Sequence, residues 1–132
     1  MSFVVDSSVL VAALVDAGPH GDWAESVLER GPIYAPELVR PETMNILRRL
    51  ERAKLITTPE ANGANADLLQ LDIDLFAFEP FAGRIWQLRH NVTSYDAWYI
   101  AVAEALALPL ATLDGALSKC SVATCEFVLP RS

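Results

Sequence analysis

The segment 93–114, TSYDAWYIAVAEALALPLATLD, decides the fold of this chain. It opens with two residues that cap helices well, Thr93 and Ser94, and Asp96 follows within the first turn. Nearly every side chain from 97 to 107 is apolar, which predicts a helix that is buried over most of its circumference. This part of the chain therefore predicts a core helix with a carboxylate near its start.

A short strand is expected directly after this helix. Pro109 should end the helix, residues 110–113 have the pattern of a buried strand, and Asp114 with Gly115 has the composition of a turn. A helix and a strand joined so tightly run the chain out and back. We therefore expect Asp114 to return to the edge of the molecule where Asp96 lies.

The rest of the chain alternates short apolar strands with helices, which predicts a parallel sheet covered by helices on both faces. Pro41 is expected either at the first position of its helix or at a kink. Strands are predicted at 3–5, 33–35, 73–78 and 127–129, and helices at 9–15, 22–30, within 36–55, from 58 onward, at 81–90 and, at most briefly, at 116–118.

The length and composition are those of one globular domain spanning residues 1–132. Of its residues 52% are hydrophobic, so disorder is not expected, and the apolar runs are too short to cross a bilayer. The start of the chain lacks a basic region and reaches Asp6 early, so no signal peptide is expected. Two cysteines, Cys120 and Cys125, do not suffice for a structural zinc site. We expect reduced thiols and a cytoplasmic protein.

The net charge is −7, which argues against a protein that passively coats nucleic acid. It does not exclude an enzyme that holds metal ions through carboxylates and meets phosphate through the metals.

Four acids are candidates for such a site. Asp6 and Asp114 are placed at the carboxyl ends of strands, where parallel sheets bind ligands. Glu42 and Asp96 are placed near helix N-termini, which lie on the same side. Taken singly, each has an ordinary structural explanation, as a cap, a first-turn acid, a turn residue or a solvated side chain.

Taken together, the four carboxylates should converge on one edge of the sheet. Crowded like charges repel, so one or more would take up a proton unless cations neutralise them. The candidates for this proton uptake are Asp96 and Asp114, and Asp114, at a strand end, is the better single choice because helix N-termini favour the charged forms of Asp96 and Glu42. Oxygen ligands with water left over suit Mg²⁺ or Mn²⁺, and two such ions can promote phosphodiester hydrolysis.

Four blocks of the chain resemble the signatures of PIN-domain ribonucleases, most closely the VapC type that forms the toxin half of toxin–antitoxin pairs. The pairing of Asp96 with Asp114, 18 residues later, is the most specific part. The blocks are FVVDSSVL (3–10), PETMNILRR (41–49), YDAWYIAVAE (95–104) and PLATLD (109–114).

This resemblance implies a three-layer α/β/α sandwich with a parallel, five-stranded sheet, metal-dependent endonuclease cleavage of RNA (tRNA, rRNA or mRNA), a homodimer and a VapB-type antitoxin. Carried over, the acids of the metal site are Asp6, Glu42, Asp96 and Asp114. Ser8 and Thr112 match positions whose hydroxyls support that site, and Arg40, beside Glu42, is a possible RNA contact.

Two alternatives stay open from the sequence. One is a catalytically silent PIN-like module that only binds a partner protein. The other is a different α/β phosphoryl-transfer hydrolase. Aspartate-nucleophile phosphatases place an acid two residues after the first aspartate, where this chain has Ser8, and phospho-receiver domains need an acidic pair that is absent before Asp6.

Overall fold

Five short strands form one parallel sheet in the computed structural model, which describes residues 1–131. The spatial order of the strands is β3-β2-β1-β4-β5, so β1 is central. Every residue of β1 is buried, which explains its continuous run of apolar side chains. The strands are β1 (Phe3–Val5), β2 (Ile33–Pro36), β3 (Ile73–Phe76), β4 (Leu110–Ala111) and β5 (Phe127–Val128).

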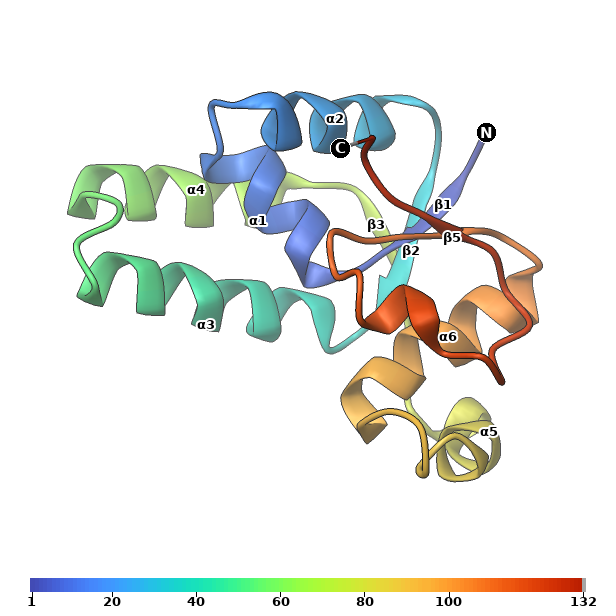
Figure 1. The fold of residues 1–132 in the computed structure, drawn as a ribbon. Helices are drawn as coiled ribbons and strands as arrows, with labels where there is room; N and C mark the ends of the chain where they lie inside the picture. Colours follow the sequence, from blue (N-terminus) through green and yellow to red (C-terminus); the bar gives the residue numbers. More distant parts are fainter. Residues whose placement is uncertain (132) are drawn as a thin grey trace.

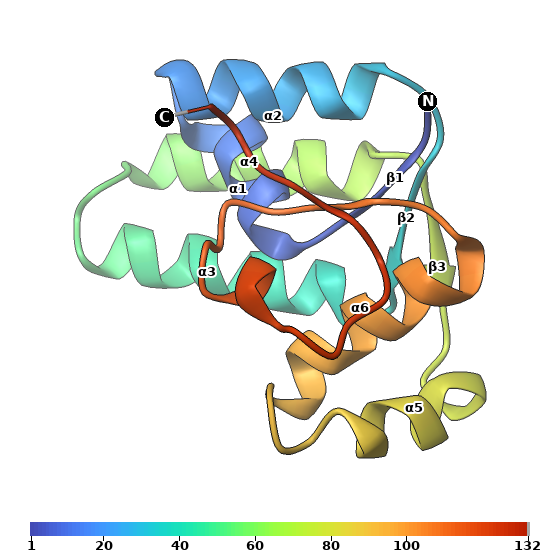
Figure 2. The same ribbon diagram turned by 45° about the vertical axis from the view of Figure 1, so that its right-hand side comes forward.

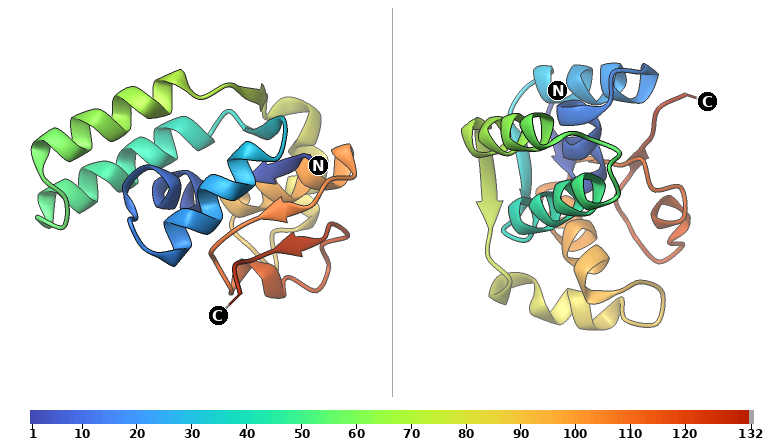
Figure 3. Two further views of the ribbon diagram at one scale, coloured as in Figure 1. Left: turned by 90° about the horizontal axis from the view of Figure 1, so that it is seen from above. Right: turned by 90° about the vertical axis from the view of Figure 1, so that its left-hand side faces the viewer.

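Helices cover both faces of this sheet, as the alternating pattern predicts. Figures 1 and 2 show α1 to α4 gathered on one side of the strands and α5 with α6 on the other. Figure 3 shows α3 and α4 side by side as an antiparallel pair. The helices are α1 (Ser7–Val15), α2 (Pro19–Glu29), α3 (Val39–Arg52), α4 (Thr58–Gln70), α5 (Ala82–Gln87) and α6 (Ser94–Leu106), with 3-10 turns η1 (Glu79–Phe81) and η2 (Leu117–Lys119).

The segment from Thr93 to Asp114 folds as a buried helix followed by a strand. The Thr93 hydroxyl accepts a hydrogen bond from the Asp96 N–H at 3.1 Å, and α6 packs on β1, β2 and β4. Pro109 does not end the helix, because α6 stops at Leu106 and Ala107 takes a left-handed conformation with φ 54° as its C-cap. The strand is shorter than predicted, at Leu110–Ala111.

Two helix starts differ from the prediction. Helix α2 begins at Pro19 rather than after Asp22, since a proline fits the first turn, where its missing N–H is not needed. Gly21 makes this early start possible, because a Cβ there would lie 1.8 Å from the Asp16 carbonyl oxygen. Helix α3 begins at Val39, so Pro41 is the third helical residue, neither the first nor the site of a break in the helix.

The region 81–90 was also predicted imperfectly. It forms the 3-10 turn η1 followed by the shorter helix α5, in which Trp86 is 67% exposed. Trp98 on α6 is instead packed edge-on against Phe78, with ring centroids 5.5 Å apart.

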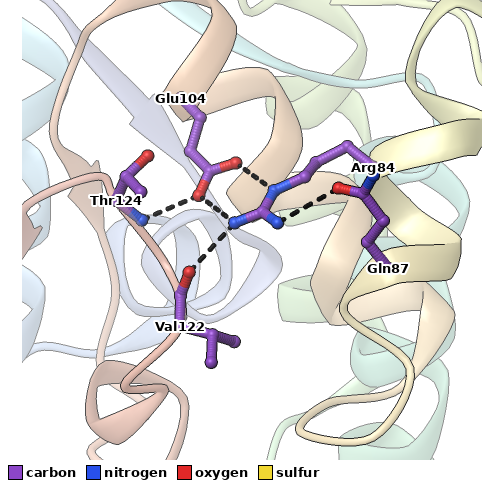
Figure 4. A network of polar contacts seen from close by, with 5 residues as sticks. All are labelled: Arg84, Gln87, Glu104, Val122 and Thr124. Carbon is purple, nitrogen blue, oxygen red and sulfur yellow. Dashed lines mark hydrogen bonds and ion pairs between the residues drawn. The ribbon is translucent and has the colours of Figure 1, made fainter.

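A polar network fastens α5 to α6 and to the segment before β5 (Figure 4). Arg84 donates to both carboxylate oxygens of Glu104, at 2.7 and 3.0 Å, and to the Val122 carbonyl at 2.9 Å. Glu104 also accepts from the Thr124 N–H at 2.7 Å. Burial acts to raise the pKa of Glu104, but these hydrogen bonds prevail and lower it.

Cys120 and Cys125 are free thiols, as expected. None of the helices formed by residues 1–131 has the length and apolar character needed to cross a membrane.

Candidate active site

The sheet register sets Asp6 beside Thr112. Val5 pairs with Ala111 in the parallel ladder between β1 and β4, so the next residues of both strands leave the sheet together at its carboxyl edge. The chain order reverses between these strands, with β2 and β3 on one side and β5 on the other. Such a reversal opens a crevice for ligands in parallel sheets.

Asp6 is held by donors on both of its carboxylate oxygens. Oδ1 accepts from the Ser8 hydroxyl at 2.5 Å and from the Val9 N–H at 3.3 Å, and Oδ2 accepts from the Thr112 hydroxyl. The Ser8 hydroxyl in turn accepts from the Leu113 N–H at 2.9 Å. Both hydroxyls that the resemblance implies as supports of the site therefore contact Asp6 and link α1 to the end of β4.

Glu42 lies in the first turn of α3 and is positioned by two hydroxyls. Its Oε1 accepts from Ser7 at 2.7 Å and from Tyr99 at 2.8 Å. Sequence reasoning missed both donors. Tyr99 is 1% exposed on α6, and a polar tip within an otherwise apolar buried helix is the signal that could have identified it.

Asp96 and Asp114 face the same open cleft, which has a volume of about 510 Å³. Asp96 is half-buried at the start of α6, and Asp114 is exposed after β4. The Oδ1 atom of Asp114 accepts from the N–H groups of Ala116 and Leu117, at 2.9 and 3.1 Å. The predicted return of Asp114 to the edge of Asp96 is confirmed.

The acids influence one another electrically. Burial raises the pKa of Asp6 to about 6, although its hydrogen bonds oppose the rise and the charge of Glu42 adds to it. Burial also raises the pKa of Asp96, together with the charges of Asp114 and Glu42. The raised pKa values of Asp6 and Asp96 agree in direction with the predicted proton uptake, which stays a prediction, as does the choice of Asp114.

The donor set consists of hard oxygens, which suits Mg²⁺ or Mn²⁺. Within residues 1–131 the only salt bridge joins Arg84 to Glu104, so no cationic side chain pairs with these acids. Among residues 1–131, Glu42 and Asp114 each keep one carboxylate oxygen without a hydrogen-bond donor. The uncompensated charge fits a divalent cation.

The expected metal cluster itself is not formed by the side chains as they lie. In the part of the chain that the structure describes, no three His, Cys, Asp or Glu side chains are close enough together to hold an ion. The four acids share one edge, and a cation would have to draw their carboxylates inward.

Arg40 is not brought to the acids, contrary to its expected role beside Glu42. Its Nη2 donates to the Leu71 carbonyl at 2.7 Å, and its Nη1 is buried. Leu71 precedes β3 and so lies towards the amino ends of the strands. Adjacency in sequence failed here because the Arg40 guanidinium is held by the carbonyl that ends α4.

A family model described as the PIN domain matches residues 3–122. The chain belongs to the PIN-domain family. This PIN domain is 36% identical to Ribonuclease VapC1 of Mycobacterium tuberculosis over 129 residues, 97% of either chain. It is 33% identical to Ribonuclease VapC9 of the same organism, over 97% of this chain and 98% of that one.

Solved structures show the same fold. A protein from Pyrobaculum aerophilum superposes with a TM-score of 0.72 at 22% identity, over 97% of this chain and 84% of the other. VapC20 of Mycobacterium tuberculosis, described as a toxin that cleaves the sarcin–ricin loop, superposes with a TM-score of 0.67 at 20% identity, over 90% of this chain and 95% of the other. The predicted family and the parallel α/β/α fold are confirmed.

Proposed function

We propose that this PIN domain is an endoribonuclease toxin of a type II toxin–antitoxin pair that hydrolyses RNA phosphodiester bonds with a divalent cation, Mg²⁺ or Mn²⁺. The observation that carries the proposal is that Asp6, Glu42, Asp96 and Asp114 share one edge of a PIN-domain sheet, at its reversal point, and influence one another electrically. Its relatives VapC1 and VapC9 are named ribonucleases.

The side chains at this edge have two roles, positioning of acids and binding of the cation. Ser8 and Thr112 fix the buried carboxylate of Asp6, and Tyr99 fixes one oxygen of Glu42. The free oxygens of Glu42 and Asp114, together with the Asp96 carboxylate, would hold the cation. A bound cation would supply positive charge for the phosphate and lower the pKa of a water. The hydrogen bonds to Asp6 and Glu42 hold these two acids in place, and the cation would draw the other carboxylates towards them.

Cleavage of RNA by the purified chain tests the proposal. Total tRNA and ribosomal RNA are incubated with the protein while Mg²⁺ or Mn²⁺ is titrated, and circular dichroism confirms folding. Asp96→Asn should reduce cleavage at least a hundredfold, because the amide keeps the shape and removes a charge. Asp67→Asn, on the exposed side of α4, is the matched control and should cleave like the wild type. Full activity of Asp96→Asn would contradict the assignment.

An apolar groove supports a protein partner. It has a volume of about 500 Å³, runs between α1 and α3, and reaches Ser8 and Leu113 beside the acids. Leu55 in its wall is 73% exposed. The proposed occupant is a VapB-type antitoxin segment with an apolar part for the groove and an Arg or Lys for the carboxylates, since a guanidinium pairs well with carboxylate oxygens.

The partner and assembly are testable together. We further propose a cytoplasmic homodimer, to be measured by light scattering with and without the antitoxin. In a structure of the complex, a cationic side chain of the antitoxin should contact the acids. The antitoxin should also abolish RNA cleavage by this chain. A complex that leaves all four acids open would contradict inhibition by direct blocking while leaving the enzyme assignment intact.

A further inference from the structure

We propose that Arg89 and Trp86, at the end of α5, dock a nucleotide of single-stranded RNA next to the acidic site. Arg89 takes a phosphate and Trp86 stacks on an unpaired base. The inference rests on the proposed function, because it places part of the same substrate on a surface that neither the sequence nor the family signatures singled out.

The two side chains form a fixed pair. The guanidinium carbon of Arg89 lies 4.3 Å from the centroid of the Trp86 ring, and its Nη1 donates to the Trp86 carbonyl at 2.9 Å. Cation–π contact and hydrogen bond together hold the guanidinium over the indole. Trp86 is nevertheless 67% exposed, so much of the ring stays open to solvent.

Arg89 also belongs to the catalytic cleft. It lines the cleft of about 510 Å³ together with His90, Asp96 and Asp114. The guanidinium forms no salt bridge with either acid, since the one ion pair in residues 1–131 is Arg84–Glu104. Stacking on the indole therefore keeps the positive charge of a cleft-lining residue from neutralising the carboxylates.

A phosphate in this cleft meets strong repulsion. It must approach Asp96 and Asp114 in a chain of net charge −7. Arg89 and His90 are the basic residues among those lining the cleft. The Arg89 guanidinium is permanently charged. An Arg–phosphate contact one step along the strand would offset the repulsion there and orient the RNA across the acids.

The indole limits the ligand to an unpaired strand. A base that stacks on an exposed aromatic ring must first leave its own helix, and such stacking tolerates any base. The pair should therefore bind single strands without strong sequence preference. Since the contact is made equally before and during the reaction, its loss should raise KM and leave kcat unchanged.

Binding is measured by fluorescence anisotropy of a fluorescein-labelled, random-sequence RNA of about twelve nucleotides, with an RNA duplex as comparison. Arg89→Gln and Trp86→Leu should each weaken single-strand binding about fivefold or more, whereas Trp86→Phe should stay within about twofold. Arg89→Gln should also reduce the slope of log Kd against log salt by about 0.7, the loss of one phosphate contact.

Arg30→Gln is the matched control. Arg30 also stacks on an aromatic ring, 5.9 Å from the centroid of Phe3, but it precedes β2 at the amino ends of the strands. Arg30→Gln removes the same charge and the same kind of contact far from the acids. The RNA affinity of this variant and the slope of its log Kd against log salt should therefore match those of the wild type. Tryptophan fluorescence adds a direct signal, because RNA should quench the wild type and not Trp86→Phe.

Cleavage kinetics separate this inference from the proposed function. If both Arg89→Gln and Trp86→Leu cleave RNA with the KM of the wild type and bind single-stranded RNA as tightly, the docking site is overturned and the ribonuclease assignment stays intact. RNA binding that depends on Arg89, without any cleavage in Mg²⁺ or Mn²⁺, would overturn the enzyme and leave the docking site. Wild-type protein that neither binds nor cleaves RNA overturns both.

Two further outcomes decide against the inference. A change of molar mass by light scattering in Trp86→Leu, with RNA binding unaffected, would show that the indole contacts a second copy of the chain. Equal weakening of single-strand binding in Arg30→Gln and Arg89→Gln would show that only net charge matters.

Discussion

At the scale of single residues, the site is built by hydroxyl groups that hold carboxylates. Ser8 and Thr112 donate to Asp6, and Ser7 and Tyr99 donate to Glu42. These donors are uncharged, so they orient the acids without cancelling the charge that a cation requires. The cost of keeping such charges buried appears in the raised pKa of Asp6.

The raised pKa of Asp6 predicts a pH-dependent stability in metal-free protein. The pKa rises from 3.8 to about 6, so the folded state binds the proton more tightly than the unfolded state. The resulting stabilisation is complete below the unfolded pKa and is lost as pH rises through about 6, a loss of roughly 3 kcal/mol. Urea unfolding in EDTA between pH 4 and pH 7 should show this decline.

Asp6→Asn should flatten that part of the stability profile, because the amide does not titrate. Asp67→Asn, exposed on α4, should keep the decline of the wild type. A profile for Asp6→Asn that falls as steeply as the wild type would mean that another group titrates in this range.

Removal of the Tyr99 hydroxyl should loosen Glu42. Tyr99→Phe deletes a hydrogen bond of 2.8 Å to a carboxylate, which should lower the free energy of unfolding by about 1–2 kcal/mol. It should reduce kcat/KM for RNA roughly tenfold, because Glu42 then depends on Ser7 alone for its orientation. Tyr34→Phe, on β2, is the control and should leave cleavage unchanged. Unaltered cleavage in Tyr99→Phe would remove Tyr99 from the site.

At the scale of elements, the end of α6 carries a conformation that its residue does not favour. Ala107 caps the helix with φ 54°, a left-handed conformation in which glycine avoids the strain of a Cβ. The cap lets the chain turn directly into β4, which places Asp114 opposite Asp96.

Ala107→Gly should therefore raise the free energy of unfolding by about 0.5–1 kcal/mol, measured by urea denaturation. Ala105→Gly provides the opposite control. This alanine is exposed within the regular part of α6, so glycine there should destabilise by about 1 kcal/mol. A destabilised Ala107→Gly variant would show that side-chain contacts of Ala107 outweigh the backbone strain.

At the scale of the whole molecule, one ion pair joins segments that are far apart in sequence. Glu104 connects Arg84 on α5 with Thr124 in the segment before β5 (Figure 4). This network supports α5, which carries Trp86, and the segment that follows Asp114. Its contacts lie away from the four acids, so its contribution should be to stability.

Glu104→Gln should lower the free energy of unfolding by about 1–2 kcal/mol, because charge-assisted hydrogen bonds become neutral ones. The effect stays this small because Arg84 is 33% exposed and solvent screens its charge. Urea unfolding of this variant is compared with Glu29→Gln, an exposed site on α2 that should change stability little. Equal midpoints for Glu104→Gln and the wild type would show that water replaces the network without loss.

The sequence by itself determined the order of the elements and indicated which four acids share the carboxyl edge of the sheet. Apolar strands such as Phe3–Val5 are predictable because a parallel sheet is covered on both faces, and the acids follow directly from the ends of these strands and the starts of helices. Ser8 and Thr112 came instead from the resemblance to PIN-domain ribonucleases, and both donate to Asp6 in the structure.

Only the tertiary structure decided which side chains meet across elements. Tyr99 reaches Glu42 over a separation of 57 residues, and Arg40 turns to Leu71 instead of to its neighbour Glu42. The exposure of Trp86 depends on α5 ending early, and its pairing with Arg89 depends on the turn that follows. Side-chain direction is set by the packing of helices against the sheet, a non-local effect that local periodicity does not encode.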